Sequence, residues 1–199
     1  MDLICSDLEG VFIPEIWINV AQRTGIEELK LTTRDITDYD VLMEKRLTIM
    51  EHHGLKLKDI TDVIDTIDPM EGAEEALTWI RERTQIIILS DTFEEFARPL
   101  MRKLGFPALF CHSLVVDSSG RITDYRLRQH NQKKHAVKAF KGLNYRVIAF
   151  GDSYNDTAML KEADHGFFFM PPDNVVKEFP QFKVTRTYEE LKTMIGSLL

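Results

Sequence analysis

The chain has 199 residues, of which 44% are hydrophobic, enough for one globular unit with a good core and a small appended module. Its formal net charge of -7 disfavours nucleic acids and anionic membranes as partners, because both require a basic face. No apolar stretch approaches membrane-spanning length and no secretion-signal pattern stands near Met1, so we expect a cytoplasmic protein with a small-molecule partner.

Strand-like apolar runs alternate with helix-like stretches along most of the chain. The strand-like runs lie at about 2–7, 86–90, 108–112, 146–150 and 166–169. The helical patterns outside the first third of the chain lie at about 72–83, 92–103, 134–141 and 153–163. This alternation predicts an α/β fold, with a Rossmann-like, mostly parallel sheet and helices on both faces. The turn residues "DSSGR" at 117–121 stand between two strand-like runs and predict a β-hairpin excursion.

The segment that follows the first strand is almost wholly helical in pattern. Two of its helical stretches run up to Gly25 and Gly54, and glycine is suited to the end of a helix. An all-helical insertion directly after the first strand has the place of a lid over an active-site crevice. We therefore expect a discontinuous core domain of residues 1–13 and 70–199 and a small α-helical cap domain of residues 14–69.

Two pairs of acidic residues follow apolar strands that lie far apart in the chain. Asp7 and Glu9 in "SDLEGV" follow the first strand, and Asp152 and Asp156 in "GDSYND" follow the run "RVIAF". Open α/β sheets bind ligands at the carboxyl ends of their strands, so we expect the four side chains in one crevice. Carboxylates gathered in this way require a cation or shared protons between them, which indicates a divalent metal. Taken alone, the tetrapeptide D-x-E-G is also common in surface turns.

A serine and two lysines suggest a site for an anion. Ser90 ends the run "IIILS" before a helical pattern, so its hydroxyl and the neighbouring N–H groups would lie at a helix N-terminus. The alternative is that Ser90, Asp91 or Thr92 merely caps that helix. Lys133 and Lys134 begin a later helical segment, where either could balance the charge of a bound phosphate or simply be solvated.

The order of these motifs resembles that of the haloacid dehalogenase superfamily, specifically its phosphoserine phosphatase branch and the bifunctional phosphoserine phosphatase/homoserine phosphotransferases within it. The longer runs "CSDLEGVFIPEIWI", "DYDVLMEKRL", "ILSDTF" and "FGDSYNDTAML" extend the similarity over nearly the whole chain. The resemblance implies a Mg²⁺-dependent enzyme that hydrolyses O-phosphoserine through an aspartyl-phosphate intermediate. The alternative within the same family is transfer of the phosphoryl group to homoserine. A non-catalytic module that binds a phospho-ligand is a third hypothesis, which the acid at position 9 and the helical cap disfavour.

The resemblance also implies separate roles for the acidic residues. Asp7 would be the nucleophile, and Glu9 would protonate the leaving oxygen and then activate water. Mg²⁺ would be held by the carboxylates of Asp7 and Asp152 and by the backbone carbonyl of Glu9. Asp156 would orient a lysine or a metal-bound water.

The substrate-binding positions implied by the resemblance come from both predicted domains. They are Glu15 for the substrate ammonium, Arg46 for its carboxylate, Ser90 and Lys133 for the phosphoryl oxygens, and Asn155 nearby. We prefer Lys133 to Lys134 for the phosphate, although the loop before the helix leaves Lys134 open. Because the superfamily often forms dimers, a homodimer is open as well.

Two residues depart from the commoner pattern of the superfamily. Glu9 stands where most such phosphatases carry Asp, and the extra methylene moves the acid without changing its chemistry. Asp91 stands where typical phosphoserine phosphatases have Gly, and an added carboxylate weakens anion binding unless it meets an ammonium or a cationic side chain. We therefore hypothesise that Asp91 helps to hold the substrate amine or orders the cap.

Overall fold

The computed structural model of the chain describes residues 1–33, 35–36 and 38–199, so two positions of the predicted cap, 34 and 37, lie outside the described residues. Its strands are β1 (Asp2–Ser6), β2 (Gln85–Phe93), β3 (Ala108–Val116), β4 (Ile122–Arg126), β5 (Arg146–Gly151), β6 (His165–Phe169) and β7 (Lys183–Thr185). In the described residues these strands form one sheet in the order β4-β3-β2-β1-β5-β6-β7. Neighbouring strands are parallel except for the antiparallel pair β3 and β4.

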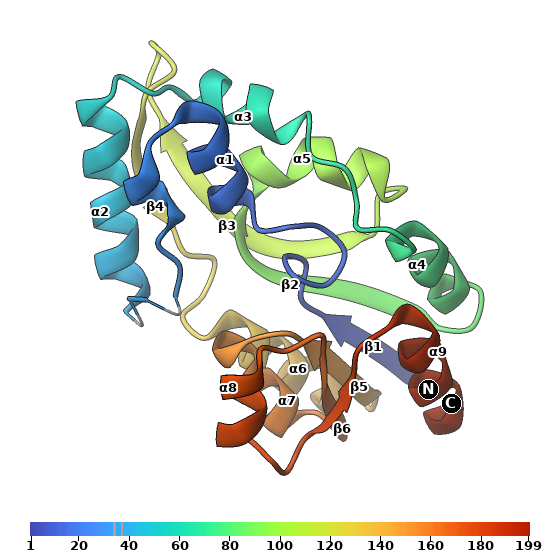
Figure 1. The fold of residues 1–199 in the computed structure, drawn as a ribbon. Coiled ribbons are helices and arrows are strands. Elements are labelled where there is room, and N and C mark those ends of the chain that lie inside the picture. Colours follow the sequence, from blue (N-terminus) through green and yellow to red (C-terminus); the bar gives the residue numbers. More distant parts are fainter. Residues whose placement is uncertain (34, 37) are drawn as a thin grey trace.

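The helices surround this sheet (Figure 1). They are α1 (Ile16–Thr24), η1 (Glu27–Lys30), α2 (Tyr39–His52), α3 (Leu57–Ile64), α4 (Ala73–Arg81), α5 (Glu94–Lys103), α6 (Gln132–Gly142), η2 (Tyr154–Asp156), α7 (Thr157–Glu162), α8 (Asp173–Glu178) and α9 (Tyr188–Leu198). None of the helices in the described part of the chain combines the length and apolar character that a membrane span requires.

Alternate residues of the central strands point into two hydrophobic cores, one on each face of the sheet. Ile4 of β1 belongs to the core that includes side chains of α4, α5 and α9. Leu3 and Cys5 belong to the second core, which includes side chains of α6, α7 and α8. Because successive side chains of a strand point to opposite faces, this division places helices on both faces. The predicted α/β fold with a mostly parallel sheet is confirmed.

The sheet is wider than its sequence pattern suggests. The residues "DSSGR" join β3 to the antiparallel β4, so the predicted hairpin is present. Beyond residue 169, where no element was expected, the chain adds α8, the three-residue strand β7 and α9. A three-residue strand such as Lys183–Thr185 is too short to show an alternating pattern.

The residues between β1 and α4 form a helical segment, as expected. Gly25, with a backbone φ of 73°, ends α1, and Gly54, with a φ of 66°, follows the end of α2. This left-handed conformation closes a helix and costs glycine little. In the segment, α3 packs against α5 and α2 packs against β4 (Figure 1).

The helical segment shares its hydrophobic core with the sheet. Trp17 of α1 packs edge-to-face on Phe96 of α5, with ring centroids 5.5 Å apart. Met43 and Ile60 of the segment lie in the same buried cluster as these two rings. The segment and α5 therefore share one apolar core, and Lys103 at the end of α5 adds polar contacts with Asp65, Ile67 and Asp68.

The packing of β6 against α7 generates a test of stability. A Cβ at Gly166 would overlap the backbone carbonyl of Leu160, which cannot rotate away as a side chain could. We expect Gly166→Ala to lower the free energy of unfolding by about 2 kcal/mol or more, measured by urea denaturation. Gly142→Ala is the matched control, because nothing lies within 4 Å of a Cβ at that position. Equal stability of the two variants would contradict this account.

Candidate active site

The turn after β1 brings the first acid pair against the second. Asp7 follows the strand, and its N–H donates a hydrogen bond to the carbonyl of Phe150 at the end of β5, at 3.1 Å. Gly10 turns the chain with a φ of 73°, and a Cβ there would overlap the carboxylate of Asp152. Glycine is therefore required at position 10 both for the turn and for the approach of Asp152.

The turn after β5 folds back on itself in a similar way. One carboxylate oxygen of Asp156 accepts hydrogen bonds from the N–H groups of Asp152, at 3.0 Å, and Ser153, at 3.1 Å. A Cβ on Gly151 would overlap this carboxylate, so the small residue leaves the space that Asp156 fills. Asp156 is fully buried, and it fixes the loop that presents Asp152.

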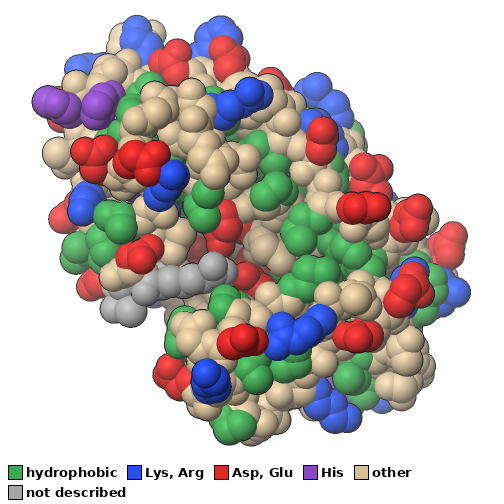
Figure 2. Space-filling model, viewed as in Figure 1, with side chains coloured by type: hydrophobic (Ala, Val, Ile, Leu, Met, Phe, Trp, Pro, Cys, Tyr) green, Lys and Arg blue, Asp and Glu red, His purple; other side chains and the backbone are tan. Residues whose placement is uncertain are grey.

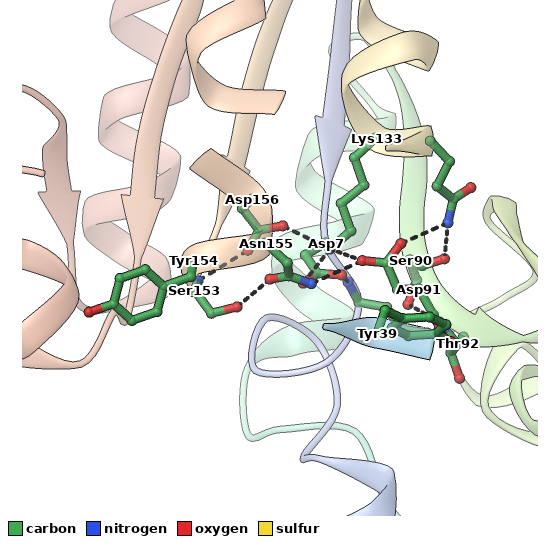
Figure 3. A network of polar contacts seen from close by, with 12 residues as sticks. Asp7, Tyr39, Ser90, Asp91, Thr92, Lys133, Ser153, Tyr154, Asn155 and Asp156 are labelled. Carbon is green, nitrogen blue, oxygen red and sulfur yellow. Dashed lines mark hydrogen bonds and ion pairs between the residues drawn. The ribbon is translucent and has the colours of Figure 1, made fainter. Parts of the chain in front are cut away.

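A buried lysine joins the two acid pairs (Figure 3). Lys133, in the first turn of α6, is 3% exposed. Its Nζ lies 2.9 Å from Asp7 Oδ2 and 2.8 Å from Asp156 Oδ1. Lys134 is partly exposed, and no side-chain partner for it occurs among the described residues. Of the two lysines that the sequence left open, Lys133 is the one that reaches Asp7.

The charged groups in this cluster shift one another's pKa values. Burial and the neighbouring carboxylate of Asp156 raise the pKa of Asp7 well above its usual range, while Lys133 opposes them. Burial on its own would lower the pKa of Lys133, but Asp156 and Asp7 outweigh it and the pKa rises well above its usual value. Lys133 is therefore a permanent positive charge next to Asp7 at neutral pH.

Three carboxylates in this cluster are placed as metal ligands would be. Asp7, Asp152 and Asp156 are buried, and one oxygen from each lies within 4.8 Å of the others. Carboxylate oxygens are hard donors, which suit a hard divalent cation. Both oxygens of Asp156 already bond to Lys133 or to backbone N–H groups. The donor set therefore fits such a cation, while Asp156 is in addition held by Lys133 and by the loop that carries Asp152.

Ser90 lies in a bulge of β2 and not at a helix N-terminus, so that part of the prediction is wrong. Leu89 pairs with Phe110 and Phe93 pairs with His112, so three residues of β2 stand opposite one residue of β3. Helix α5 begins only at Glu94, and no side chain of the described residues caps it. The alternative that Ser90, Asp91 or Thr92 caps the helix is therefore wrong too. The strand continues for three residues beyond the predicted end, and the bulge turns Asp91 and Thr92 toward the site, while Phe93 belongs to the hydrophobic core.

The carboxylate of Asp91 meets cationic and amide groups. It accepts hydrogen bonds from Asn155 at 3.1 Å and from Gln132 at 3.2 Å, and it lies 3.8 Å from Lys133 Nζ. His112 Nε2 lies 3.6 Å away. Burial would raise the pKa of Asp91, but Lys133 and these hydrogen-bonding neighbours hold it below its usual range. The cationic partner that a carboxylate needs at this position is therefore Lys133.

One small cavity of about 70 Å³ collects most of the predicted site residues. Figure 2 shows acidic side chains in a hollow near the centre of the molecule, where the helical segment meets the rest of the chain. The predicted residues that line this cavity are Asp7, Glu9, Glu15, Arg46, Ser90, Asp91, Asp152 and Asn155. The two others, Lys133 and Asp156, lie behind Asp7. The structure thus brings all ten predicted residues to one place.

Arg46 of α2 is held by several contacts and keeps one donor unused. Its guanidinium lies 4.5 Å from the centre of the Trp17 ring and donates a hydrogen bond to the carbonyl of Leu31 at 2.8 Å. Burial lowers its pKa to about 10, so it stays charged at neutral pH. Its Nε is buried, and no partner for it occurs among the described residues. This side chain is therefore rigid, charged and able to bind an acceptor.

Glu9 lies between the sheet and the helical segment. Its carboxylate accepts a hydrogen bond from the N–H of Ile16 at 2.8 Å, so it caps the N-terminus of α1. Burial and the nearby charge of Glu15 raise the pKa of Glu9 to about 8. Glu9 therefore holds a proton at neutral pH and can donate it.

Sequence reasoning missed several residues that shape the site. The hydroxyl of Tyr39 donates to the backbone carbonyl of Asp91 at 2.8 Å, and Gln132 donates to the carbonyl of Ser90. Trp17 also lines the cavity and lies against Arg46. None of the three stands in a spacing that marks a site, and Gln132 is distinguished only by preceding Lys133.

Comparison with known proteins gives consistent matches. The sequence profile of the haloacid dehalogenase-like hydrolases matches residues 2–164. The phosphoserine phosphatase ThrH of Pseudomonas aeruginosa is 60% identical over 192 residues, which cover 96% of this chain and 94% of that protein. A phosphoserine phosphatase of Pseudomonas syringae is 59% identical, over 96% of this chain and 81% of its own length. A substrate-bound phosphoserine phosphatase structure has the same fold, with a TM-score of 0.77 at 21% identity and 97% of each chain covered.

The charge cluster around Lys133 predicts a pH-dependent loss of stability. Lys133→Met should cost about 3–5 kcal/mol of unfolding free energy near pH 8, because it leaves buried carboxylates without their cation. The pKa of Asp7 then rises further above its unfolded value. The folded variant binds more protons than the unfolded chain, so its stability should increase as the pH falls toward about 5.5. Urea denaturation at both pH values measures this, with Lys134→Met as the control. An equally large loss of unfolding free energy in Lys134→Met would contradict this role of Lys133. So would a loss in Lys133→Met that does not change with pH.

Proposed function

The chain belongs to the haloacid dehalogenase-like hydrolases, and we propose that it hydrolyses O-phosphoserine to serine and phosphate through an aspartyl-phosphate on Asp7. The observation that carries the proposal is the single cavity in which Asp7 and Glu9 meet Glu15 and Arg46. The first two residues suit phosphoryl transfer, and the second two suit the charged ends of an amino acid. The names of the two relatives at 60% and 59% identity support this choice of substrate.

Asp7 is proposed as the nucleophile. One of its carboxylate oxygens accepts the N–H of Leu8 at 2.7 Å, and the other lies beside the ammonium of Lys133. A carboxylate oxygen would attack phosphorus while the bond from phosphorus to the seryl oxygen breaks. Lys133 supports this role because it favours the ionised form of Asp7 against burial and Asp156.

Glu9 is proposed as the general acid and base. With its raised pKa it would donate a proton to the leaving seryl oxygen. The resulting carboxylate would then take a proton from the water that attacks the aspartyl-phosphate and releases phosphate. The hydrogen bond from Ile16 fixes the orientation of this side chain.

Ser90, Lys133 and Asn155 are proposed to bind the phosphoryl oxygens, and Asp91 to order them. The Asp91 carboxylate contacts Lys133 and Asn155, while its carbonyl accepts from Tyr39 of α2. The carboxylate contacts support ordering of Lys133 and Asn155 over the two roles considered for Asp91, binding of the substrate amine and ordering of the cap, because the contact with Tyr39 of α2 is made by the backbone.

Mg²⁺ is the proposed cofactor. The carboxylates of Asp7 and Asp152, together with the backbone carbonyl of Glu9, would hold it, and Asp156 would orient Lys133. When bound, the ion neutralises negative charge on the transferring phosphoryl group. The buried hard donors described above support this assignment.

Residues 14–69 are proposed to act as a cap that opens for the substrate. The closed cavity of about 70 Å³ is far below the ~300–1,000 Å³ typical of ligand pockets. Glu15 and Arg46 belong to this segment, so its closure would bring the groups proposed for the substrate ammonium and carboxylate onto the phosphate site. Such closure also excludes water, and a hydroxyl acceptor such as homoserine would then compete with water for the phosphoryl group.

The direct test is an assay of O-phosphoserine with Mg²⁺, in which serine and phosphate are both measured. We expect turnover that Asp7→Asn lowers by at least about 10³-fold, because it removes the nucleophile. Asp124→Asn, which changes an exposed carboxylate on β4, is the matched control and should leave turnover unchanged. Addition of homoserine tests the transferase alternative, which would yield phosphohomoserine at the expense of phosphate. Full activity of Asp7→Asn would end both enzymatic proposals.

Recognition of the amino group can be tested separately from the chemistry. We expect Glu15→Gln to raise KM for O-phosphoserine about tenfold, because it removes the proposed charge partner of the substrate ammonium. The same variant should hydrolyse p-nitrophenyl phosphate, which has no amino group, within about twofold of the parent enzyme. Glu28→Gln changes an exposed glutamate of η1 and serves as the control. Equal effects on both substrates would assign Glu15 to structure instead of recognition.

A further inference from the structure

A second hollow in the described part of the chain lies apart from the catalytic cavity. It is a groove of about 760 Å³ between α5, the first half of β3 and the end of β4. Helix α5 and β3 lie against one another along this side of the molecule (Figure 1). Its volume falls within the ~300–1,000 Å³ of sites that hold small molecules.

The groove is basic in a protein that is acidic overall. Four arginines line it, Arg98, Arg102, Arg126 and Arg128, against the single acidic residue Glu94. Arg98 is paired with Glu94 at 3.0 Å. Among the described residues, the guanidinium groups of Arg102 and Arg126 have no acidic partner within 4 Å. The formal net charge of the chain is -7, so this concentration of positive charge runs against the average composition.

Aromatic and apolar side chains form the rest of the groove. Leu109 and Phe110 of β3 and Met101 of α5 contribute to its lining, and the guanidinium of Arg128 lies 5.0 Å from the centre of the Phe110 ring. Phe106, at the edge, is 69% exposed and has a left-handed φ of 53°. A large ring presented to solvent beside unpaired guanidinium groups suits a ligand with both a flat apolar body and a negative charge.

Two contacts connect the groove to the catalytic cavity. The guanidinium of Arg128 donates to Gln132 Oε1 at 2.8 Å and 3.1 Å, and the amide of Gln132 donates in turn to the carbonyl of Ser90. The backbone N–H of Arg128 donates to His112 Nδ1 at 3.1 Å, and His112 faces Asp91. A ligand that displaces the Arg128 guanidinium would remove the hydrogen bonds that Gln132 Oε1 accepts from it.

The geometry points to a second ligand site in this groove, for a small aromatic anion such as an aromatic carboxylate, sulfonate or phosphate. Arg102 and Arg126 bind the anionic group, and Phe106 and Phe110 contact the ring. A ligand ring on Phe110 takes the place of the Arg128 guanidinium, which then leaves Gln132 and so loosens the backbone that presents Ser90. The site itself is independent of the proposed function, whereas its effect on hydrolysis rests on that function.

The binding test uses the whole protein and 8-anilinonaphthalene-1-sulfonate, an aromatic sulfonate whose fluorescence increases on binding. We expect the double variant Arg102→Ala/Arg126→Ala to raise its dissociation constant about tenfold or more, since charge-assisted hydrogen bonds are lost. Lys138→Ala/Lys177→Ala removes two exposed cations elsewhere and should change it by less than about twofold. N-phenyl-1-naphthylamine, which lacks the sulfonate, should not distinguish the two double variants. Equal sulfonate affinity of the two double variants, or no binding to the parent protein, would overturn the site.

The coupling test measures hydrolysis of O-phosphoserine with and without the same sulfonate. At saturation we expect kcat to fall about fivefold in the parent protein and in the lysine control, without competition against substrate. The arginine double variant should hydrolyse the substrate normally and lose this inhibition. Groove binding without an effect on kcat, or inhibition that competes with substrate, would overturn the coupling. A parent protein that binds the sulfonate but does not hydrolyse phosphoserine would refute the proposed function and leave the site standing.

Discussion

The buried ammonium of Lys133 is the charge on which the arrangement of the site depends. It contacts Asp7 after β1 and Asp156 after β5, and it faces Asp91 in β2. Moving a carboxylate from water into a protein interior costs several kcal/mol, so these acids can lie together only with a cation among them. One side chain from α6 thus holds the ends of three strands in a fixed relation, and the proposed chemistry needs that relation before any ligand is bound.

Two glycines and a β-bulge adapt the backbone to this cluster of charged side chains. Gly10 and Gly151 stand where a side chain would collide with Asp152 or Asp156. The bulge at Ser90 breaks the pairing of β2 with β3 and turns polar residues inward. These irregularities occur where the strands of the sheet end, while the two hydrophobic cores beneath them are regular. These three features lie at the carboxyl ends of the strands, where ligands bind to an α/β sheet.

The sequence predicts the strands formed by strong apolar runs and the acids that follow them. It does not predict features that depend on contacts between residues far apart in the chain. The apolar runs before Asp7 and Asp152 are strong, so the ends of β1 and β5 that carry these acids could be predicted from the sequence. The bulge at Ser90 depends on register with β3, which no pattern within β2 records. Tyr39 reaches Asp91 only because α2 folds back over the sheet, and a contact across 52 positions leaves no periodic signal. The boundaries at 14 and 69 and the chemical roles of the site residues remain predictions.

The hydrogen bond from the first N–H of α1 to Glu9 makes the environment of this carboxyl group depend on the position of α1. Glu9 belongs to the loop after β1, whereas α1 belongs to the segment that must move if the cavity is to admit a ligand. A displacement of α1 either carries the carboxylate with it or exposes it to water, and in water its pKa returns toward the ordinary value. The raised pKa of Glu9 therefore depends on α1 staying in its present position. If Glu9 is the proton donor proposed above, a displaced α1 would leave the site without that donor, and a bound phosphoester would not be cleaved before the segment closes.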